Sequence, residues 1–171
     1  MVIEIRAELP ADSAAISQVH TKAFGGAVEA KLVQLICERK KGVISLVAAT
    51  DGTVVGHILF SRVTVAEAPD SFRAVGLAPV AVLPEFQRKG NGSKLIREGL
   101  ARSKQAGYDA VVVIGDPSYY SRFGFLRAAD FGLRNEYGVH DEFMILSLHD
   151  GALNGISGLI KYVPEFREAE G

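Results

Sequence analysis

Cysteine is nearly absent from this sequence, which has one, Cys37, among 171 residues. A single thiol allows neither a disulfide framework nor a cysteine-based zinc site, and we expect no metal site of another kind. Because Cys37 falls in an apolar segment, we expect its side chain to be small, hydrophobic and buried. The chain also lacks an excess of charge. Its formal net charge of −1 gives no global field that would attract nucleic acid or an anionic membrane.

Long apolar runs are missing as well. The longest run, around Ala110 to Ile114, is far too short to span a bilayer. Near the N-terminus, Glu4, Arg6 and Glu8 interrupt the apolar stretch that a signal peptide would need. With 48% apolar and 23% charged residues, the composition is typical of a soluble globular protein, and a cytoplasmic location is expected.

The even composition predicts a single domain over residues 1–171, with a core at about 2–148 and a C-terminal extension at 149–171. Apolar periodicity predicts elements in the order β-α-α-β-β-β-α-β-α-β. The expected strands lie at about 2–9, 43–50, 53–65, 73–82, 108–115 and 142–148, and the Gly-rich tail is expected to add a short one. The first expected helix lies within 10–24, with Asp12 or Ser13 as its cap, and the others lie at about 28–40 and 91–106, with a turn or short helix at 117–123.

Local signals refine this pattern. The dipeptide Asp51-Gly52 separates two β-rich runs and suits a tight antiparallel hairpin turn. Segment 73–115 is a strand–helix–strand crossover, which predicts a mixed sheet with helices on both faces. Pro79 lies inside the strand at 73–82, where a residue without an N–H marks an edge, a bulge or the end of pairing.

The stretch "QRKGNG" (Gln87 to Gly92) lies where that strand turns into a helix. Gly90 and Gly92 leave bare main chain at a helix start, where unpartnered amides and the helix dipole favour phosphate groups. Between Phe86 and Gln105 there are six basic residues and one acid. A GxGxxG dinucleotide fingerprint is excluded by Leu95, and a Walker loop is excluded because Lys94 follows Ser93.

The stretch "QRKGNG" resembles the pyrophosphate-binding motif of the GNAT superfamily of N-acetyltransferases, Q/R-x-x-G-x-G/A. Downstream, "YSRFGF" (Tyr120 to Phe125) resembles the family's Tyr-x-x-x-Gly-Phe ending. Further stretches, including "GLAPVAV" and the "GLIKYVPEF" tail, resemble one bacterial subgroup, the YhbS-like proteins. The resemblance implies an α/β (α+β), three-layer GNAT fold. Its mixed, mostly antiparallel sheet of about 6–7 strands is splayed between the fourth and fifth strands, with helices on both faces.

The resemblance also implies where acetyl-CoA would bind and react. Main-chain groups of the fourth strand would hold the pantetheine arm, and loop amides would hold the pyrophosphate. The Val82 amide would stabilise the oxyanion, and Tyr120 would protonate the leaving thiolate, with Tyr119 as a less favoured substitute. The expected cofactor-binding residues are Val80, Ala81, Val82, Gln87, Arg88, Lys89, Gly90, Asn91, Gly92, Ser93, Tyr120 and Arg122.

The residue that deprotonates the acceptor amine is left open. Many GNAT proteins have a glutamate on the fourth strand, but "VGLAPVAV" (75–82) contains no acid. Glu29, Asp116, Glu142 and a chain of waters are the candidates. The expected function is acetyl transfer from acetyl-CoA to a primary amine; a longer acyl donor and a CoA-binding regulatory module without turnover are the alternatives. Acetyl-CoA and an amine are the expected partners, without nucleic acid or membrane, and a homodimer is the assembly considered.

Overall fold

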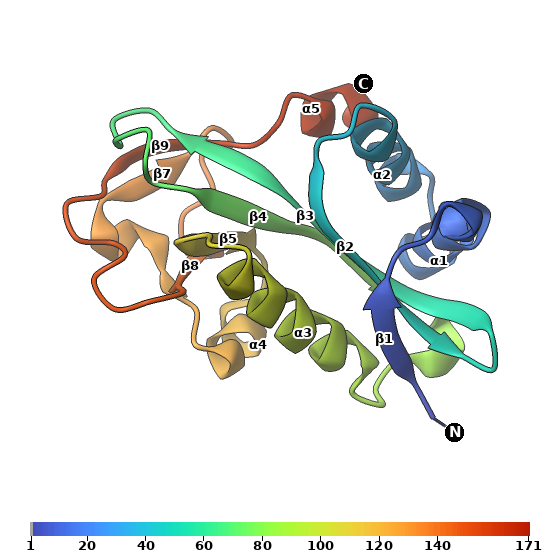
Figure 1. The fold of residues 1–171 in the computed structure, drawn as a ribbon. Helices are drawn as coiled ribbons and strands as arrows, with labels where there is room; N and C mark the ends of the chain where they lie inside the picture. Colours follow the sequence, from blue (N-terminus) through green and yellow to red (C-terminus); the bar gives the residue numbers. More distant parts are fainter. Residues whose placement is uncertain (1) are drawn as a thin grey trace. The chain divides into compact units, whose positions relative to one another are not determined.

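The computed structural model describes residues 2–171, which form two compact units. The first unit contains residues up to Ser61 together with 78–99 and 164–171, and the second contains 62–77 and 100–163. Figure 1 shows the helices and strands, coloured along the sequence. No helix in the described part of the chain is both long enough and apolar enough to cross a bilayer.

An antiparallel sheet forms the framework of the first unit. Its strands are β1 (Glu4–Ala7), β2 (Gly42–Thr50), β3 (Thr53–Val65) and the last part of β4 (Ala74–Val82), in that order. The predicted hairpin between β2 and β3 is confirmed, because Asp51 and Gly52 take φ angles of 50° and 78° between paired Thr50 and Thr53. Such angles suit a two-residue turn between twisted strands.

Helices cover both faces of this sheet. They are α1 (Ser13–Phe24), α2 (Val28–Glu38) and α3 (Asn91–Gln105). On one face, a Cβ added to Gly56 of β3 would lie 3.1 Å from Leu95 of α3, so the missing side chain allows close packing. His57 points to the other face, where its ring hydrogen-bonds to His20 of α1 at 2.8 Å. Because successive strand residues alternate between faces, α3 and α1 lie on opposite sides.

The C-terminal helix α5 (Glu165–Glu170) belongs to the first unit and packs against α2. Glu165 is buried and accepts hydrogen bonds from Arg39 Nη1 at 2.9 Å and Lys41 Nζ at 3.1 Å. Burial alone would raise the pKa of Glu165, but the hydrogen bonds from both cations outweigh it and lower the pKa. The last residues of the chain are therefore tied to the segment between α2 and β2.

The second unit is built on the start of β4 and on β5 (Ala110–Ile114), which is buried over Ala110–Val113 as predicted. β5 pairs in parallel with β4 and antiparallel with β8 (Phe143–Ser147), and β8 also pairs with β6 (Leu126–Arg127). The tail adds β9 (Gly158–Lys161), which pairs with the end of β3 and with β7 (Leu133–Asn135). The short helix α4 (Pro117–Tyr120) follows β5.

Pairing between β4 and β5 ends early. It covers three residue pairs, from Ala74 with Ala110 to Gly76 with Val112. Within residues 2–171, no β4 residue after Gly76 pairs with β5, although β4 continues to Val82. Pro79, which has no N–H to donate, lies in the part of β4 that has left this pairing. The predicted opening between the fourth and fifth strands is confirmed.

The predicted elements appear in the predicted order, and three details differ, of which the first is that helix α5 was not predicted. Residues 2–171 contain nine strands rather than six or seven, because β6 and β7 are pieces of only 2 and 3 residues that carry no alternating pattern. Cys37 is exposed, not buried, since it lies one position beyond the buried residue Ile36 on α2.

Candidate active site

The segment after β4 forms a loop that two side-chain amides pin at its ends. It begins with a 3-10 turn over Pro84–Phe86 and ends where α3 starts. Gln87 Nε2 donates to the Val82 carbonyl at 2.8 Å. The buried Asn91 side chain donates through Nδ2 to the Phe86 carbonyl at 2.9 Å. These two bonds fix the path of the main chain between them.

The main chain between these bonds has the conformation of a helix entrance. Arg88 and Gly90 take φ angles of 62° and 82°, and a Cβ added to Gly90 would meet no heavy atom within 4 Å. The Lys94 N–H donates to the Gly90 carbonyl at 3.0 Å, which closes the first turn of α3. Amides of a first helical turn have no intrahelical partner and carry partial positive charge. The loop therefore has the geometry that suits phosphate groups.

Basic side chains surround this entrance. Arg88, Lys89 and Lys94 are all exposed, and Lys89 Nζ lies 5.7 Å from the centre of the Phe86 ring. Exposed cations beside main-chain donors add long-range attraction for an anion to the short-range geometry of the amides. The arrangement favours a ligand that carries more than one negative charge.

The end of β4 turns part of its main chain away from β3. The Leu83 N–H donates to the Val55 carbonyl of β3 at 2.8 Å. In an extended chain, the main-chain N–H and C=O groups of successive residues point to opposite edges. The main-chain groups of Val80 and Val82 therefore point away from β3. The Ala81 carbonyl, in contrast, lies on the β3 side, 3.2 Å from where a Cβ on Gly56 would be. Val80 and Val82 thus present N–H groups at the edge that β5 has left.

Tyr120 ends α4 in the second unit and is 9% exposed. Its ring packs edge-to-face on Phe125, with centroids 5.7 Å apart, and on Tyr119 at 5.1 Å. Gly115 makes room for it, because a Cβ there would lie 2.3 Å from Tyr120 Cε2. Burial, with a smaller effect of Tyr119, raises the pKa of the Tyr120 phenol to about 12. The group is thus a proton donor that stays protonated at neutral pH.

Arg122, which follows α4, is exposed and stacks over the Tyr119 ring, with Cζ 4.5 Å from the ring centre. Tyr119 is half-buried beneath this cation, whereas Tyr120 is buried. This difference favours Tyr120 over Tyr119 as a group that delivers a proton in a low-dielectric setting.

The comparison with protein families decides the assignment. A sequence profile described as "Acetyltransferase (GNAT) domain" matches residues 4–128. The chain belongs to the GNAT acetyltransferase family. The matched GNAT region includes the glycine-rich loop, Val80 and Val82 of β4, and Tyr120, so the motifs that predicted the family all lie within it.

Individual GNAT relatives resemble nearly the whole chain. "Uncharacterized N-acetyltransferase YhbS" of Escherichia coli K12 is 40% identical over 164 residues, which is 95% of this chain and 97% of the relative. The crystal structure of E. coli YhbS in complex with CoA matches with a TM-score of 0.91 and 38% identity, over 96% of this chain and 92% of that one. A GNAT acetyltransferase from Brucella melitensis in complex with acetyl-CoA has a TM-score of 0.80 and 37% identity, over 96% and 98%.

The three candidate bases of this GNAT protein lie in different settings. Asp116 caps α4, because its carboxylate accepts hydrogen bonds from the Ser118 N–H at 3.0 Å and the Ser118 hydroxyl at 2.9 Å. Glu142 is exposed, and its carbonyl accepts from the Gly115 N–H at 2.9 Å. Glu29 is half-buried in the first turn of α2. Asp116 is the least suited to proton transfer, since its carboxylate already fixes a helix start.

Sequence reasoning missed one polar cluster of the first unit. His20 and His57 are fully buried and hydrogen-bonded to each other, and Ser45 links His57 to Glu8. These residues are far apart in the sequence and match no motif. A faint signal existed in His57, a polar residue within an otherwise apolar strand run.

Proposed function

We propose that this GNAT protein is an acetyl-CoA-dependent N-acetyltransferase that transfers acetyl directly to a primary amine, with a small molecule as the favoured acceptor. The observation that carries the proposal is the glycine-rich helix entrance, where pinned main chain and exposed cations suit a pyrophosphate. The binding of CoA by the E. coli relative and of acetyl-CoA by the Brucella relative supports the same donor.

The donor would be held by two sets of main-chain groups. Amides from Arg88 to Ser93 would receive the pyrophosphate, and the N–H groups of Val80 and Val82 would receive the pantetheine arm. Gln87 and Asn91 would contribute indirectly, because their side chains fix the loop. The Ala81 carbonyl lies on the β3 side and faces away from the arm. Ala81 would therefore contact the pantetheine arm through its side chain. Lys89 and Arg122 would add positive charge around the phosphates.

The thioester of the bound donor supplies the carbonyl that the neutral amine attacks. The Val82 N–H would stabilise the negative charge that develops on the carbonyl oxygen, because a fixed dipole need not reorganise. Tyr120 would give its proton to the departing thiolate, and its raised pKa ensures that the proton is present. Since β4 has no acid, the amine proton would leave through Glu29, Glu142, Asp116 or a chain of waters.

Two measurements on the purified chain test this function. Calorimetry should show saturable heat with CoA, and acetyl-CoA should release thiol when a panel of primary amines is added. CoA binding without thiol release across a broad panel would favour a regulatory module instead. Mass spectrometry of products from acyl-CoA donors of increasing length would show whether a longer acyl group is preferred. Absence of heat with CoA would reject the proposal.

A further inference from the structure

A pocket of about 300 Å³ lies in the first unit between the end of β1, the start of α1 and the second half of α2. Its wall shares no residue with the glycine-rich loop or with β4. The apolar part of the wall consists of small or branched side chains, and the polar part consists of Glu8, Ser13, Ser17, Gln34, Cys37 and Glu38. The volume is at the lower end of the range for small-molecule sites.

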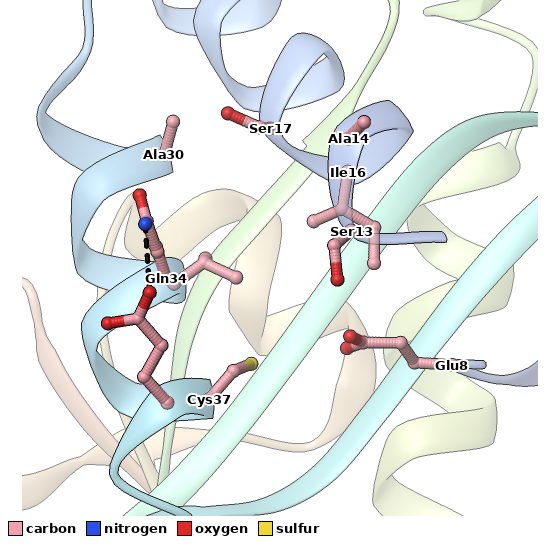
Figure 2. Close-up of a pocket in the computed structure, with 10 residues that line it drawn as sticks. Glu8, Ser13, Ala14, Ile16, Ser17, Ala30, Gln34 and Cys37 are labelled. Carbon is pink, nitrogen blue, oxygen red and sulfur yellow. Dashed lines mark hydrogen bonds between the residues drawn. The ribbon is translucent and has the colours of Figure 1, made fainter. Parts of the chain in front are cut away.

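The charge on this wall has one sign. Among the described residues that line the pocket, two are acids, Glu8 and Glu38, and none is basic. Figure 2 shows the Glu8 carboxylate pointing into the space opposite the Cys37 sulfur. Glu38 Oε1 accepts a hydrogen bond from Gln34 Nε2 at 2.9 Å, and both residues belong to α2.

Glu8 is fixed from behind by the buried cluster. Its Oε1 accepts a hydrogen bond from the Ser45 hydroxyl and lies 3.7 Å from His57 Nε2. No residue in the described part of the chain hydrogen-bonds to its other oxygen, Oε2. One oxygen is therefore anchored, and the other is available to a ligand.

The hydrogen bonds of the cluster point toward Glu8. Because the Ser45 hydroxyl donates to the carboxylate, Ser45 accepts from His57 Nε2 at 2.8 Å, and His57 Nδ1 lies 2.8 Å from His20 Nε2. Burial, and to a smaller degree the electrostatic effect of His57, lowers the pKa of His20 to about 3. His20 is therefore neutral at neutral pH. Aligned donors stabilise negative charge at the end of the chain that faces the pocket. The nearby His57 side chain and the hydrogen bond from Ser45 outweigh burial and lower the pKa of Glu8.

We propose that this pocket binds a small organic cation of the alkylammonium class. The charged group would lie between the carboxylates of Glu8 and Glu38, and its alkyl part would cover the apolar wall at Ala14, Ala30 and Val33. This site goes beyond the acetyl transfer proposed above and does not depend on it. A metal ion is a poorer fit, because the described residues contain no group of three or more His, Cys, Asp or Glu side chains that could hold one.

Cys37 provides a reporter inside the pocket, because it is the single cysteine of the chain and its side chain is exposed. The pKa of the Cys37 thiol is raised to about 11, mainly by partial desolvation and to a smaller degree by the charges of Glu8 and Glu38. Cys37 should therefore react slowly with methanethiosulfonates. For each reagent, the rate with Cys37 is divided by the rate with free mercaptoethanol. The charge ratio is this normalised rate for the reagent with a trimethylammonium group divided by that for the reagent with a sulfonate. We expect a charge ratio of about ten.

The charge ratio should fall in Glu8→Gln and in Glu38→Gln. Glu38→Gln leaves the buried cluster intact, so it keeps the test valid if Glu8→Gln unfolds. Glu4→Gln removes one exposed charge from β1, the strand that precedes Glu8, without touching the pocket, and it should keep the wild-type ratio. A ratio near one in the wild type, or an equal ratio in all variants, would overturn the proposal.

Occupancy is tested with choline and its neutral isostere 3,3-dimethylbutanol, without acetyl-CoA. Choline has no N–H, so it cannot be N-acetylated and its binding is measured without turnover. At about 10 mM, choline should slow modification of Cys37 by the neutral methyl reagent severalfold, and the alcohol should not. Equal protection by both, or protection by neither, would refute a cation site. Neither result would bear on CoA binding, which calorimetry measures separately.

Discussion

Replacing Gly90 with alanine isolates the conformational role of the glycine-rich loop. Gly90 has a φ of 82°, and a Cβ there would touch nothing within 4 Å, so the cost of the change is backbone strain rather than a clash. Holding an L-residue in the left-handed region costs about 1–2 kcal/mol. Arg88 to Gly90 are exposed, so the free loop can relieve that strain by turning its amides away. CoA binding must then restore the orientation of the amides and meet the strain of about 1–2 kcal/mol. This cost corresponds to a Kd for CoA that is about 5- to 30-fold weaker.

Gly52→Ala is the matched control. Gly52 also has a positive φ, 78°, and an open Cβ position, but the paired residues Thr50 and Thr53 hold it in the hairpin. Its strain cannot relax locally, so it should lower the free energy of unfolding by about 1–2 kcal/mol and leave CoA affinity unchanged. Calorimetry gives the Kd and denaturant melts give the stability. If Gly90→Ala bound CoA within about twofold of the wild type, the proposed role of the loop would be wrong.

Three further predictions concern turnover, packing and pH. Tyr120→Phe should lower kcat by about 10²- to 10⁴-fold with little change in CoA affinity, whereas Tyr119→Phe should keep wild-type turnover; comparable rates in both would reject Tyr120 as the acid. With its pKa near 12, Tyr120 itself should cause no loss of turnover up to about pH 10, measured as a kcat–pH profile. Gly99→Ala should lower Tm despite better helix propensity, because its Cβ would lie 2.3 Å from buried Phe60; an unchanged Tm would contradict this packing. The folded pKa of Glu165 lies below its unfolded value, so its stabilising effect is present above about pH 4.5 and lost as pH falls. The Tm advantage of wild type over Glu165→Gln should thus shrink on acidification, and a constant difference would contradict the assignment.

The sequence predicted those parts of the fold that have short-range causes. Asp51-Gly52 specifies its turn by local φ preferences, and the buried run around Val111 and Val112 identifies a central parallel strand. The phosphate-type loop was also readable, because glycines, cations and a helix start follow one another directly. Pro79 was interpreted as an edge, a bulge or the end of pairing, and it lies in the part of β4 that no longer pairs with β5.

Features that depend on distant contacts escaped prediction. The loop is pinned by Gln87 and Asn91 through bonds that run back toward β4, which no spacing rule indicates. The pocket carboxylate Glu8 meets its partners only because the register of β1, β2 and β3 places Ser45 and His57 beside it. A one-residue slip of any of these strands would turn the polar side chain to the other face. Sequence alone does not fix that register.

The antiparallel partner of β5 lies outside the region that the family profile matches. A chain shortened to end at residue 128 would lack β8, which pairs with β5 along its full length from Ala110 to Ile114. It would leave an uncovered row of apolar residues with unpaired main-chain groups, a template on which further copies can add. The expected product is aggregate rather than a minimal catalyst, so the foldable boundary of this protein lies well beyond the boundary of its recognisable motif.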